Sequence, residues 1–325
     1  MAYPVTRMRR LRSNAHIRSL VRETNLDHAD LVLPIFIREG IDQPYPISGM
    51  PNVMVQSLAS LEEEVKSCLD SGLHAVMLFG IPVQKDALGS SAYSEDNITV
   101  ASIMALKDKF QEDIVVMADL CLDEYSDHGH CGIVGADGKV QNDETLVLYS
   151  KIALLYAKAG VDFVAPSGMM DGQVGAIRSS LDSAGYHNTA ILAYSAKYAS
   201  ALYGPFREAV DVSIANGGDR KTYQQDIGNA SESLREIALD IEEGADMVMV
   251  KPAITNLDII AKAKEKFNFP LAAYQVSGEY SMVLAAAAKG MFDARATAYE
   301  MLLSIKRAGA DAIITYFAKE IVSYL

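Results

Sequence analysis

Short apolar runs alternate with amphipathic stretches along most of this chain. Eight such runs cover residues 31–37, 75–81, 114–120, 162–168, 189–195, 245–251, 270–276 and 311–317. Most are continuously apolar, as expected for parallel strands that are covered on both faces. The stretches between them, such as 60–72, 142–160 and 256–267, have the apolar spacing of helices, and several end in glycine. The pattern predicts eight β–α units.

Eight β–α units in 325 residues indicate the α/β class and a (β/α)8 TIM barrel. A doubly wound open sheet is the alternative, but no G-x-G-x-x-G follows the first strand. We expect residues 26–325 to form the barrel as the catalytic domain, with its chemistry at the carboxyl ends of the strands. The polar residues at six strand ends are Asp119, Ser167, Lys197, Lys251, Ser277 and Tyr316.

Composition and charge exclude several classes of function. The formal net charge is −13, so the chain has no basic excess with which to neutralise the phosphates of a nucleic acid. It has no apolar run of about 18 residues, so we expect no membrane span. Three cysteines are too few for a disulfide framework, and they fit a reducing compartment such as the cytoplasm.

The N-terminal segment differs from the rest. Its first 22 residues contain six arginines and no acidic residue. An arginine-rich, acid-poor start can belong to an organelle transit peptide. We favour a basic arm, residues 1–25, that packs on the acidic body of this chain or of a neighbouring copy.

Two lysines stand at strand ends. The run "MVMVKPAITN" (247–256) ends its apolar part in Lys251, and Lys197 follows the fifth run in "YSAKYAS". Two ammonium groups at one barrel mouth repel each other, so at least one pKa falls, and a neutral amine can form a Schiff base with a ketone or aldehyde. One of the lysines could instead bind a substrate carboxylate, or both could be ordinary solvated residues.

The loop "DLCLDEYSDHGHCG" (119–132) combines thiol, imidazole and carboxylate side chains. Such density predicts a metal site, and a catalytic metal with open positions is plausible. A structural site of four thiolates is excluded by the cysteine count. The alternative is a solvated acidic loop. The residues of this kind are Asp119, Cys121, Asp123, Glu124, Asp127, His128, His130 and Cys131.

A long polar segment, residues 197–226, follows the fifth strand. It is too polar and glycine-rich for one helix, and long βα loops of barrels are often lids. Four of its residues could bind a carboxylate, although each alone is more often a surface residue. They are Arg207, Arg220, Lys221 and Gln224.

Nine motifs together resemble the porphobilinogen synthase, or 5-aminolevulinate dehydratase, family over essentially the whole chain. They are "RMRRLR", "LFGIP", "NDET", "APSGMMDG", "YSAKYASALYGPFR", "GDRKTYQ", "GADMVMVKPA", "VSGEY" and "AGADAIITY". The resemblance implies a barrel with an N-terminal arm that embraces a neighbour, typically in a homo-octamer. It implies a lyase that condenses two molecules of 5-aminolevulinate to porphobilinogen, an early step of tetrapyrrole (heme) synthesis.

The resemblance also implies roles for the strand-end residues. Lys251 matches the Schiff-base lysine, and Lys197 forms the second Schiff base or assists. Asp119 and Ser167 lie where contacts to the substrate amine and proton transfers are expected. The two substrate carboxylates are expected on separate groups, Arg207 with Arg220 and Gln224, and Ser277 with Tyr316.

The resemblance implies two metal sites as well. Zinc-using members have three cysteines in the loop, whereas this chain has Cys121, Asp123 and Cys131. Two thiolates favour Zn²⁺ by softness, and Mg²⁺ is the alternative. Glu236 matches a remote ligand of an allosteric Mg²⁺ near a neighbour's arm. Gly168 is a second departure, because many members have an aspartate there.

Two other functions are compatible with parts of the pattern. A class I aldolase-type barrel acting on another ketone would keep one Schiff-base lysine but has no use for the second lysine and the Cys/Asp loop. An inactive metal-binding or scaffold barrel would be free to lose the lysines and the lid arginines, yet all are present.

Overall fold

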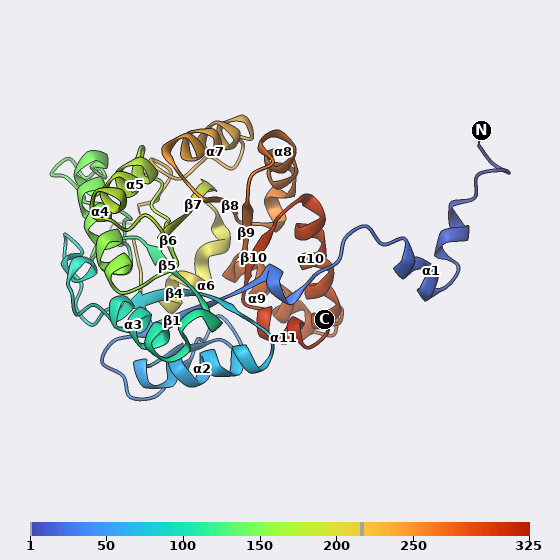
Figure 1. Cartoon of the computed structure of the whole chain (residues 1–325), viewed down its shortest axis with the longest axis horizontal. Coiled ribbons are helices and arrows are strands. Elements are labelled where there is room, and N and C mark those ends of the chain that lie inside the picture. Colours follow the sequence, from blue (N-terminus) through green and yellow to red (C-terminus); the bar gives the residue numbers. More distant parts are fainter. Residues whose placement is uncertain (1, 215–217) are drawn as a thin grey trace.

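Eight parallel strands close into a barrel in the computed structural model, which describes residues 2–214 and 218–325. Each strand pairs with the next, and the last pairs back onto the first (Figure 1). The fold predicted from the eight apolar runs is therefore confirmed. The barrel strands are β1 (Leu31–Arg38), β4 (Ala75–Ile81), β5 (Val115–Leu120), β6 (Phe163–Pro166), β7 (Ala190–Lys197), β8 (Met247–Lys251), β9 (Leu271–Gln275) and β10 (Ala312–Thr315).

Helices follow the strands and form a ring outside the barrel (Figure 1). Local sequence fixes several helix starts: the side chains of Ser57 and Asn97 accept backbone N–H groups at the first turns of α2 and α3. The helix α7 ends at Gly244, which has a φ of 104° and provides the usual left-handed stop. The ring consists of α2 (Leu58–Asp70), α3 (Ile98–Phe110), α4 (Asn142–Lys158), α5 (Gln173–Ser183), α7 (Ser231–Glu243), α8 (Leu257–Phe267), α9 (Ser277–Ala287) and α10 (Ala294–Ala308).

Several shorter elements lie outside the barrel strands and the ring of helices. The strands β2 (Tyr45–Pro46) and β3 (Met54–Gln56) extend the sheet beside β1. The segment predicted as a lid contains a 3₁₀ turn (Ala201–Tyr203) and the short helix α6 (Gly204–Ala209), while its residues 215–217 lie outside the described residues. Further short elements are α11 (Ala318–Val322) and the 3₁₀ turns His28–Asp30, Ser90–Tyr93, Gln111–Asp113 and Ile254–Asn256.

A one-residue irregularity in the β7–β8 pairing aligns the two strand-end lysines. Ala193 pairs with Val248, but Ala196 pairs with Val250, so β7 has one residue more than β8 over this interval. Such a bulge reverses the side that every later side chain faces. Because of it, Lys197 lies directly opposite Lys251, and both face into the barrel mouth.

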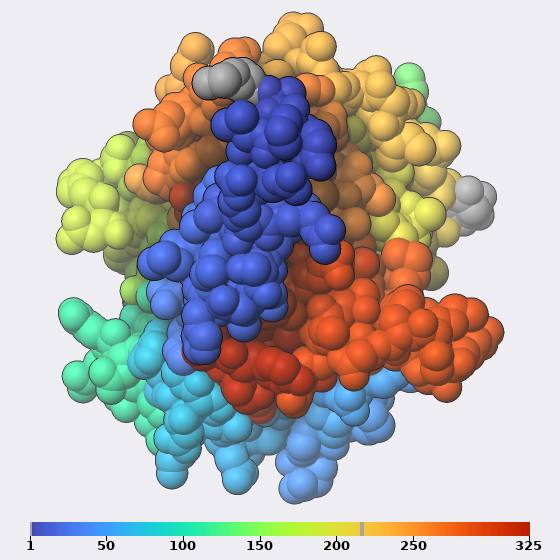
Figure 2. Space-filling view, turned by 90° about the vertical axis from the view of Figure 1, so that its right-hand side faces the viewer, coloured from blue at the N-terminus to red at the C-terminus, as the bar shows by residue number. Residues whose placement is uncertain are grey.

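The N-terminal segment leaves the barrel (Figures 1 and 2). It contains a 3₁₀ turn (Met8–Arg12) and the short helix α1 (Ala15–Leu20), neither of which buries a residue. Apolar side chains on it are exposed, including Tyr3 at 75% and Leu20 at 85%. The segment therefore does not pack on the body of its own chain in this structure.

No helix in the described part of the chain is long and apolar enough to cross a membrane, as the sequence predicts.

Candidate active site

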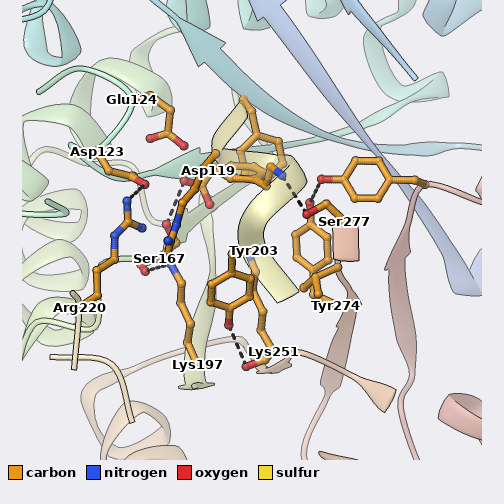
Figure 3. Close-up of a pocket in the computed structure, with 15 residues that line it drawn as sticks. Asp119, Asp123, Glu124, Ser167, Lys197, Tyr203, Arg220, Lys251, Tyr274 and Ser277 are labelled. Atoms are coloured by element: carbon orange, nitrogen blue, oxygen red, sulfur yellow. Dashed lines mark hydrogen bonds and ion pairs between the residues drawn. The ribbon is translucent and has the colours of Figure 1, made fainter. Parts of the chain in front are cut away.

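All six polar strand-end residues line one cavity at the carboxyl end of the barrel (Figure 3). Parallel strands bring their carboxyl ends to the same rim, which explains why residues from six strands meet. The loop of residues 119–132, called the metal loop below because a metal site is predicted there, contributes Asp123 and Glu124 to the wall. The segment predicted as a lid, residues 197–226, contributes Arg207 and Arg220. The structure thus brings together most of the residues singled out in the sequence.

Lys251 lies in a cage of aromatic rings. Its Nζ is 4.2 Å from the ring centre of Tyr274, 5.1 Å from Tyr194, 5.3 Å from Tyr203 and 5.4 Å from Phe206. Only 6% of the residue is exposed. Burial and the positive charge of Lys197 lower the pKa of Lys251 to about 7, so a large fraction of its amine is neutral and nucleophilic at neutral pH.

Lys197 is the charged member of the pair. Its Nζ donates a hydrogen bond to the carbonyl of Ser167 at 2.6 Å. Burial alone would lower its pKa, but the charges of Cys131 and Asp123 help to outweigh burial and raise the pKa of Lys197 above its ordinary value. The repulsion expected between two lysines therefore falls on Lys251.

Asp119 lines the cavity together with the two amines. Its Oδ2 accepts a hydrogen bond from Ser167 Oγ at 2.9 Å, whereas its buried Oδ1 has no hydrogen-bond partner among the described residues. Burial raises the pKa of Asp119 to about 6, and the two lysines act in the opposite direction. A carboxyl group with this pKa can both accept and return a proton near neutral pH.

The pKa of Lys251 leads to a prediction about pH. The rate at which borohydride traps the imine of a small ketone on Lys251 should rise as pH increases through about 7, because only the neutral amine attacks. Lys197→Met removes the positive neighbour, so the pKa of Lys251 should increase and the rise should move up by roughly one pH unit. Mass spectrometry of Lys251 peptides measures the rate at each pH.

The control is Lys262→Met, which removes an exposed lysine on α8. Its profile should match that of the unmodified protein. A profile that stays in place in Lys197→Met would contradict the electrostatic coupling of the two lysines.

A buried carboxyl group holds the turns that follow β8 and β9. Glu279, in the first turn of α9, accepts the backbone N–H of Val276 at 2.6 Å and that of Ile254 at 2.7 Å. Burial raises the pKa of Glu279 to about 7, although these backbone hydrogen bonds act in the opposite direction. The contacts link the turn after Lys251 to the turn that carries Ser277.

Ser277 and Tyr316 line the same cavity, and Ser277 lies away from Asp123 and Glu124 (Figure 3). The Ser277 Oγ accepts the backbone N–H of Phe206 at 3.0 Å, and the Tyr316 hydroxyl lies 3.1 Å from that of Tyr274. These two hydroxyl groups can donate hydrogen bonds to a carboxylate.

The residues expected to bind the other carboxylate hold unused donors. Among the described residues, the Nε atoms of Arg207 and Arg220 and the amide nitrogen of Gln224 are buried donors without a hydrogen-bond partner, and the Gln224 amide oxygen is a buried acceptor without one. Arg207 and Arg220 line the main cavity, whereas Gln224 lines the adjoining hollow with them. Buried orphan donors are rare, and several together indicate an anion site.

Among the described residues, Cys121, Asp123 and Cys131 form a group with the spacing of a metal site. All three are buried, and one ligand atom from each lies within 4.8 Å of the others. Burial raises the pKa of the Cys121 thiol, while a hydrogen bond from Cys121 and the charge of Arg220 outweigh burial and lower that of Cys131. Two sulfur ligands and one carboxylate fit Zn²⁺ better than Mg²⁺.

Gly168 is explained by a tyrosine behind the metal loop. A Cβ atom at residue 168 would lie 1.8 Å from the Tyr149 hydroxyl oxygen. That hydroxyl donates a hydrogen bond to the carbonyl of Cys131 at 2.7 Å and lies 3.7 Å from the Cys121 sulfur. Tyr149 occupies the space that a side chain at residue 168 would need, so the tyrosine at 149 requires glycine at 168.

Gly168→Ala should destabilise the protein by about 1–3 kcal/mol, because the new methyl group overlaps Tyr149. Tyr149→Phe in the same chain should restore part of the loss, since it removes the nearest atom but leaves the ring carbon at 2.7 Å. Urea unfolding measures both. The control is Gly204→Ala, because a Cβ atom at Gly204 would meet no atom within 4 Å. Equal losses at Gly168 and Gly204 would contradict the proposed overlap.

Glu236 lies apart from the cavity, on α7. It lines a separate hollow with Asp171, Glu232 and Gln224. Burial, followed by the charges of Asp171 and Glu232, raises its pKa above the ordinary value. In this single chain Glu236 belongs to no compact group of metal ligands among the described residues.

The apolar part of the site could not be predicted from the sequence. The four rings around Lys251 and the two aromatic residues Phe79 and Tyr149 were not predicted as site residues. Three of the rings around Lys251 belong to the motif "YSAKYASALYGPFR", which supplies Tyr194, Tyr203 and Phe206, but an aromatic residue in a barrel is more often core. Glu279 in "VSGEY" carried the stronger signal, because its acidic side chain lies beside a strand end.

Comparisons with known proteins agree over the whole chain. The family model described as delta-aminolevulinic acid dehydratase matches residues 5–324. The delta-aminolevulinic acid dehydratases of Streptomyces coelicolor and Methanothermus sociabilis are 51% and 53% identical to this chain, and each alignment covers 98% or more of both proteins. The crystal structure of delta-aminolevulinic acid dehydratase (porphobilinogen synthase) from Toxoplasma gondii ME49, in complex with the reaction product porphobilinogen, is also similar. It has a TM-score of 0.96 and 44% identity, and the match covers 98% of this chain and 91% of that one.

Proposed function

Since this chain belongs to the delta-aminolevulinic acid dehydratase family, we propose that it condenses two molecules of 5-aminolevulinate through Schiff bases on Lys251 and Lys197. The reaction yields porphobilinogen and two molecules of water, and it makes the chain a lyase of tetrapyrrole synthesis. The observation that carries the assignment of residues is the position of the two amines, which stand opposite each other on neighbouring strand ends in one cavity.

The chemistry begins at Lys251. Its neutral Nζ attacks the ketone carbon of one substrate, and the resulting carbinolamine loses water to give a Schiff base. The second substrate forms a Schiff base on Lys197 in the same way, after that amine has given up its proton. Each iminium withdraws electrons, so a carbon next to it loses a proton more easily and becomes a nucleophile.

Carbon–carbon bond formation joins the two substrates. The deprotonated carbon of one substrate attacks the imine carbon of the other, and Asp119 is placed to accept and return the protons that move. The amino group of one substrate then replaces a lysine amine at the other substrate's imine carbon, which closes the ring and frees that lysine. Loss of the remaining protons makes the ring aromatic and releases the second lysine.

The two carboxylates hold the substrates in register. Arg207, Arg220 and Gln224 bind one of them with donors that have no partner in the described part of the chain. Ser277 and Tyr316 bind the other. Fixing both ends holds the reacting carbons close together, which lowers the entropic part of the barrier.

We place Zn²⁺ on Cys121, Asp123 and Cys131, with Mg²⁺ as the alternative. The metal would supply Lewis-acid polarisation of a substrate oxygen or nitrogen atom. We place an allosteric Mg²⁺ near Glu236, where Asp171 and Glu232 add negative charge to the same hollow.

The proposal includes a homo-octamer in the cytoplasm. The exposed apolar side chains of the arm, Tyr3, Val5, Met8 and Leu11, favour contact with a neighbouring copy. The three cysteines are unpaired, which fits a reducing compartment.

The experiment that tests the function is the formation of a pyrrole from 5-aminolevulinate by the purified full-length protein. We expect porphobilinogen and two molecules of water for each two molecules of substrate. A protein that holds zinc and is folded but forms no pyrrole would refute the proposal, and turnover of another ketone would favour an aldolase-type reaction instead.

Glu236→Gln should abolish the stimulation of pyrrole formation by added Mg²⁺, because it removes the negative charge on which that ion is proposed to bind. The ratio of rates with and without Mg²⁺ is the measured quantity. Glu242→Gln, at an exposed residue of the same helix, should keep the stimulation. Unchanged stimulation in Glu236→Gln would remove the allosteric site from Glu236.

A further inference from the structure

Arg220 has a partner that its proposed role does not require. Its guanidinium lies 2.8 Å from Asp123 Oδ2, and both side chains are only 5% exposed (Figure 3). The same terminal nitrogen donates to the carbonyl of Gly129 at 2.8 Å. A residue expected to bind a substrate carboxylate is therefore already paired with a carboxylate of its own chain.

Asp123 is a candidate partner for two cations, the Arg220 guanidinium and the proposed metal ion. It is the middle member of the metal group, between Cys121 and Cys131. Its Oδ2 already pairs with the Arg220 guanidinium, so the same carboxylate group lies within reach of both the guanidinium and the two thiols.

Metal binding changes the charge balance around Arg220. A carboxylate that moves to a divalent cation leaves the Arg220 guanidinium buried without its counter-charge, which is costly. The Nε of Arg220 already lacks a partner, as do Arg207 Nε and Gln224 nearby. A substrate carboxylate that enters this cluster supplies the missing negative charge.

We propose that Asp123 exchanges between Arg220 and the metal, so that metal and substrate carboxylate bind cooperatively. The inference rests on the proposed function, since it takes the metal group and the carboxylate site from there. Without metal, Asp123 holds Arg220; with metal, Arg220 is released toward the substrate. The coupling is reciprocal, so the substrate must tighten metal binding by the same factor by which the metal tightens substrate binding.

The chemistry of the Asp123 side chain makes the exchange possible. A carboxylate forms strong, charge-assisted hydrogen bonds with a guanidinium and can also ligate a metal ion beside the two thiols. Asp123 is therefore a positioning residue for Arg220 as well as a candidate ligand. Arg207 offers a matched comparison, because it lines the same cavity with the same charge but has no ion pair with Asp123.

The test measures zinc affinity by competition with a chromogenic chelator, in full-length protein carrying Lys251→Met so that substrate is not consumed. The probes are Zn²⁺ alone and Zn²⁺ with 5-aminolevulinate. We expect the substrate to tighten zinc binding about tenfold. Adding Arg220→Gln should tighten zinc binding without substrate and remove the substrate effect, whereas adding Arg207→Gln should leave a substrate effect in place.

Several results would overturn the exchange. Zinc affinity that does not respond to 5-aminolevulinate, although borohydride traps the substrate on Lys197, refutes the coupling without using an Arg220 variant. Equal changes in Arg220→Gln and Arg207→Gln would assign the effect to general charge rather than to the ion pair. A protein that binds no zinc would also refute the exchange. The proposed function is tested separately, by pyrrole formation in the unmodified protein.

Discussion

Lys251→Met is expected to lower the rate of pyrrole formation by roughly 10⁴-fold or more, because it removes the amine that becomes covalently bound to substrate. Methionine is apolar and close to lysine in length, so it fills the cage formed by Tyr194, Tyr203, Phe206 and Tyr274. The variant should therefore fold with stability equal to or above that of the unmodified protein, since a buried amine is replaced by an apolar group. Steady-state kinetics and thermal unfolding measure the two effects.

Two controls separate lost chemistry from lost structure. Lys262→Met, at an exposed residue on α8, should keep full activity. Borohydride with 5-aminolevulinate should add mass to Lys251 in the unmodified protein. Appreciable turnover by Lys251→Met, or a label found only on other residues, would show that Lys251 does not have the assigned role.

Removal of metal is expected to have the second largest effect. Protein stripped by a chelator should lose roughly 100-fold or more in pyrrole formation, and Zn²⁺ alone should restore it. The donor set of two thiols and one carboxylate, all buried and within 4.8 Å, is the reason for expecting zinc. Activity with Mg²⁺ alone would mean that the loop is not a required zinc site and that Glu236 marks the important metal.

The chain offers a matched pair of cysteines for this experiment. Cys131→Ser should abolish the rescue by Zn²⁺, because a hydroxyl is a poor zinc ligand. Cys68→Ser, at a buried cysteine on α2 outside the metal group, should leave the rescue intact. Loss of rescue in both variants would point to a general effect of replacing a buried thiol.

The barrel could be predicted from the sequence because its signal is local. Each barrel strand is buried on both faces, so each appears as a continuous apolar run, and the eight runs match the eight barrel strands. The ends of the runs indicate which residues lie at the barrel mouth, so Lys251 and Asp119 could be predicted as site residues. Their prediction requires only the position of each residue relative to its own strand.

The remaining features depend on contacts between distant segments. The ion pair joins residues 123 and 220, and Tyr149 meets Gly168 across two β–α units. Neither contact leaves a periodic trace in the sequence. The bulge between Ala193 and Ala196 is similarly silent, although without it Lys197 would face away from Lys251. Local pattern therefore predicted which residues reach the cavity but not how they pair within it.

The closure of β10 onto β1 has a consequence for how copies of this chain can associate. None of the eight barrel strands in the described residues presents an unpaired edge, so another chain cannot add a strand to them. The outer edge of β2 is only two residues long, Tyr45–Pro46, and its proline has no N–H to donate. Any association of copies through the barrel must then use surfaces other than strand edges, and the closed barrel cannot aggregate by edge-to-edge strand pairing.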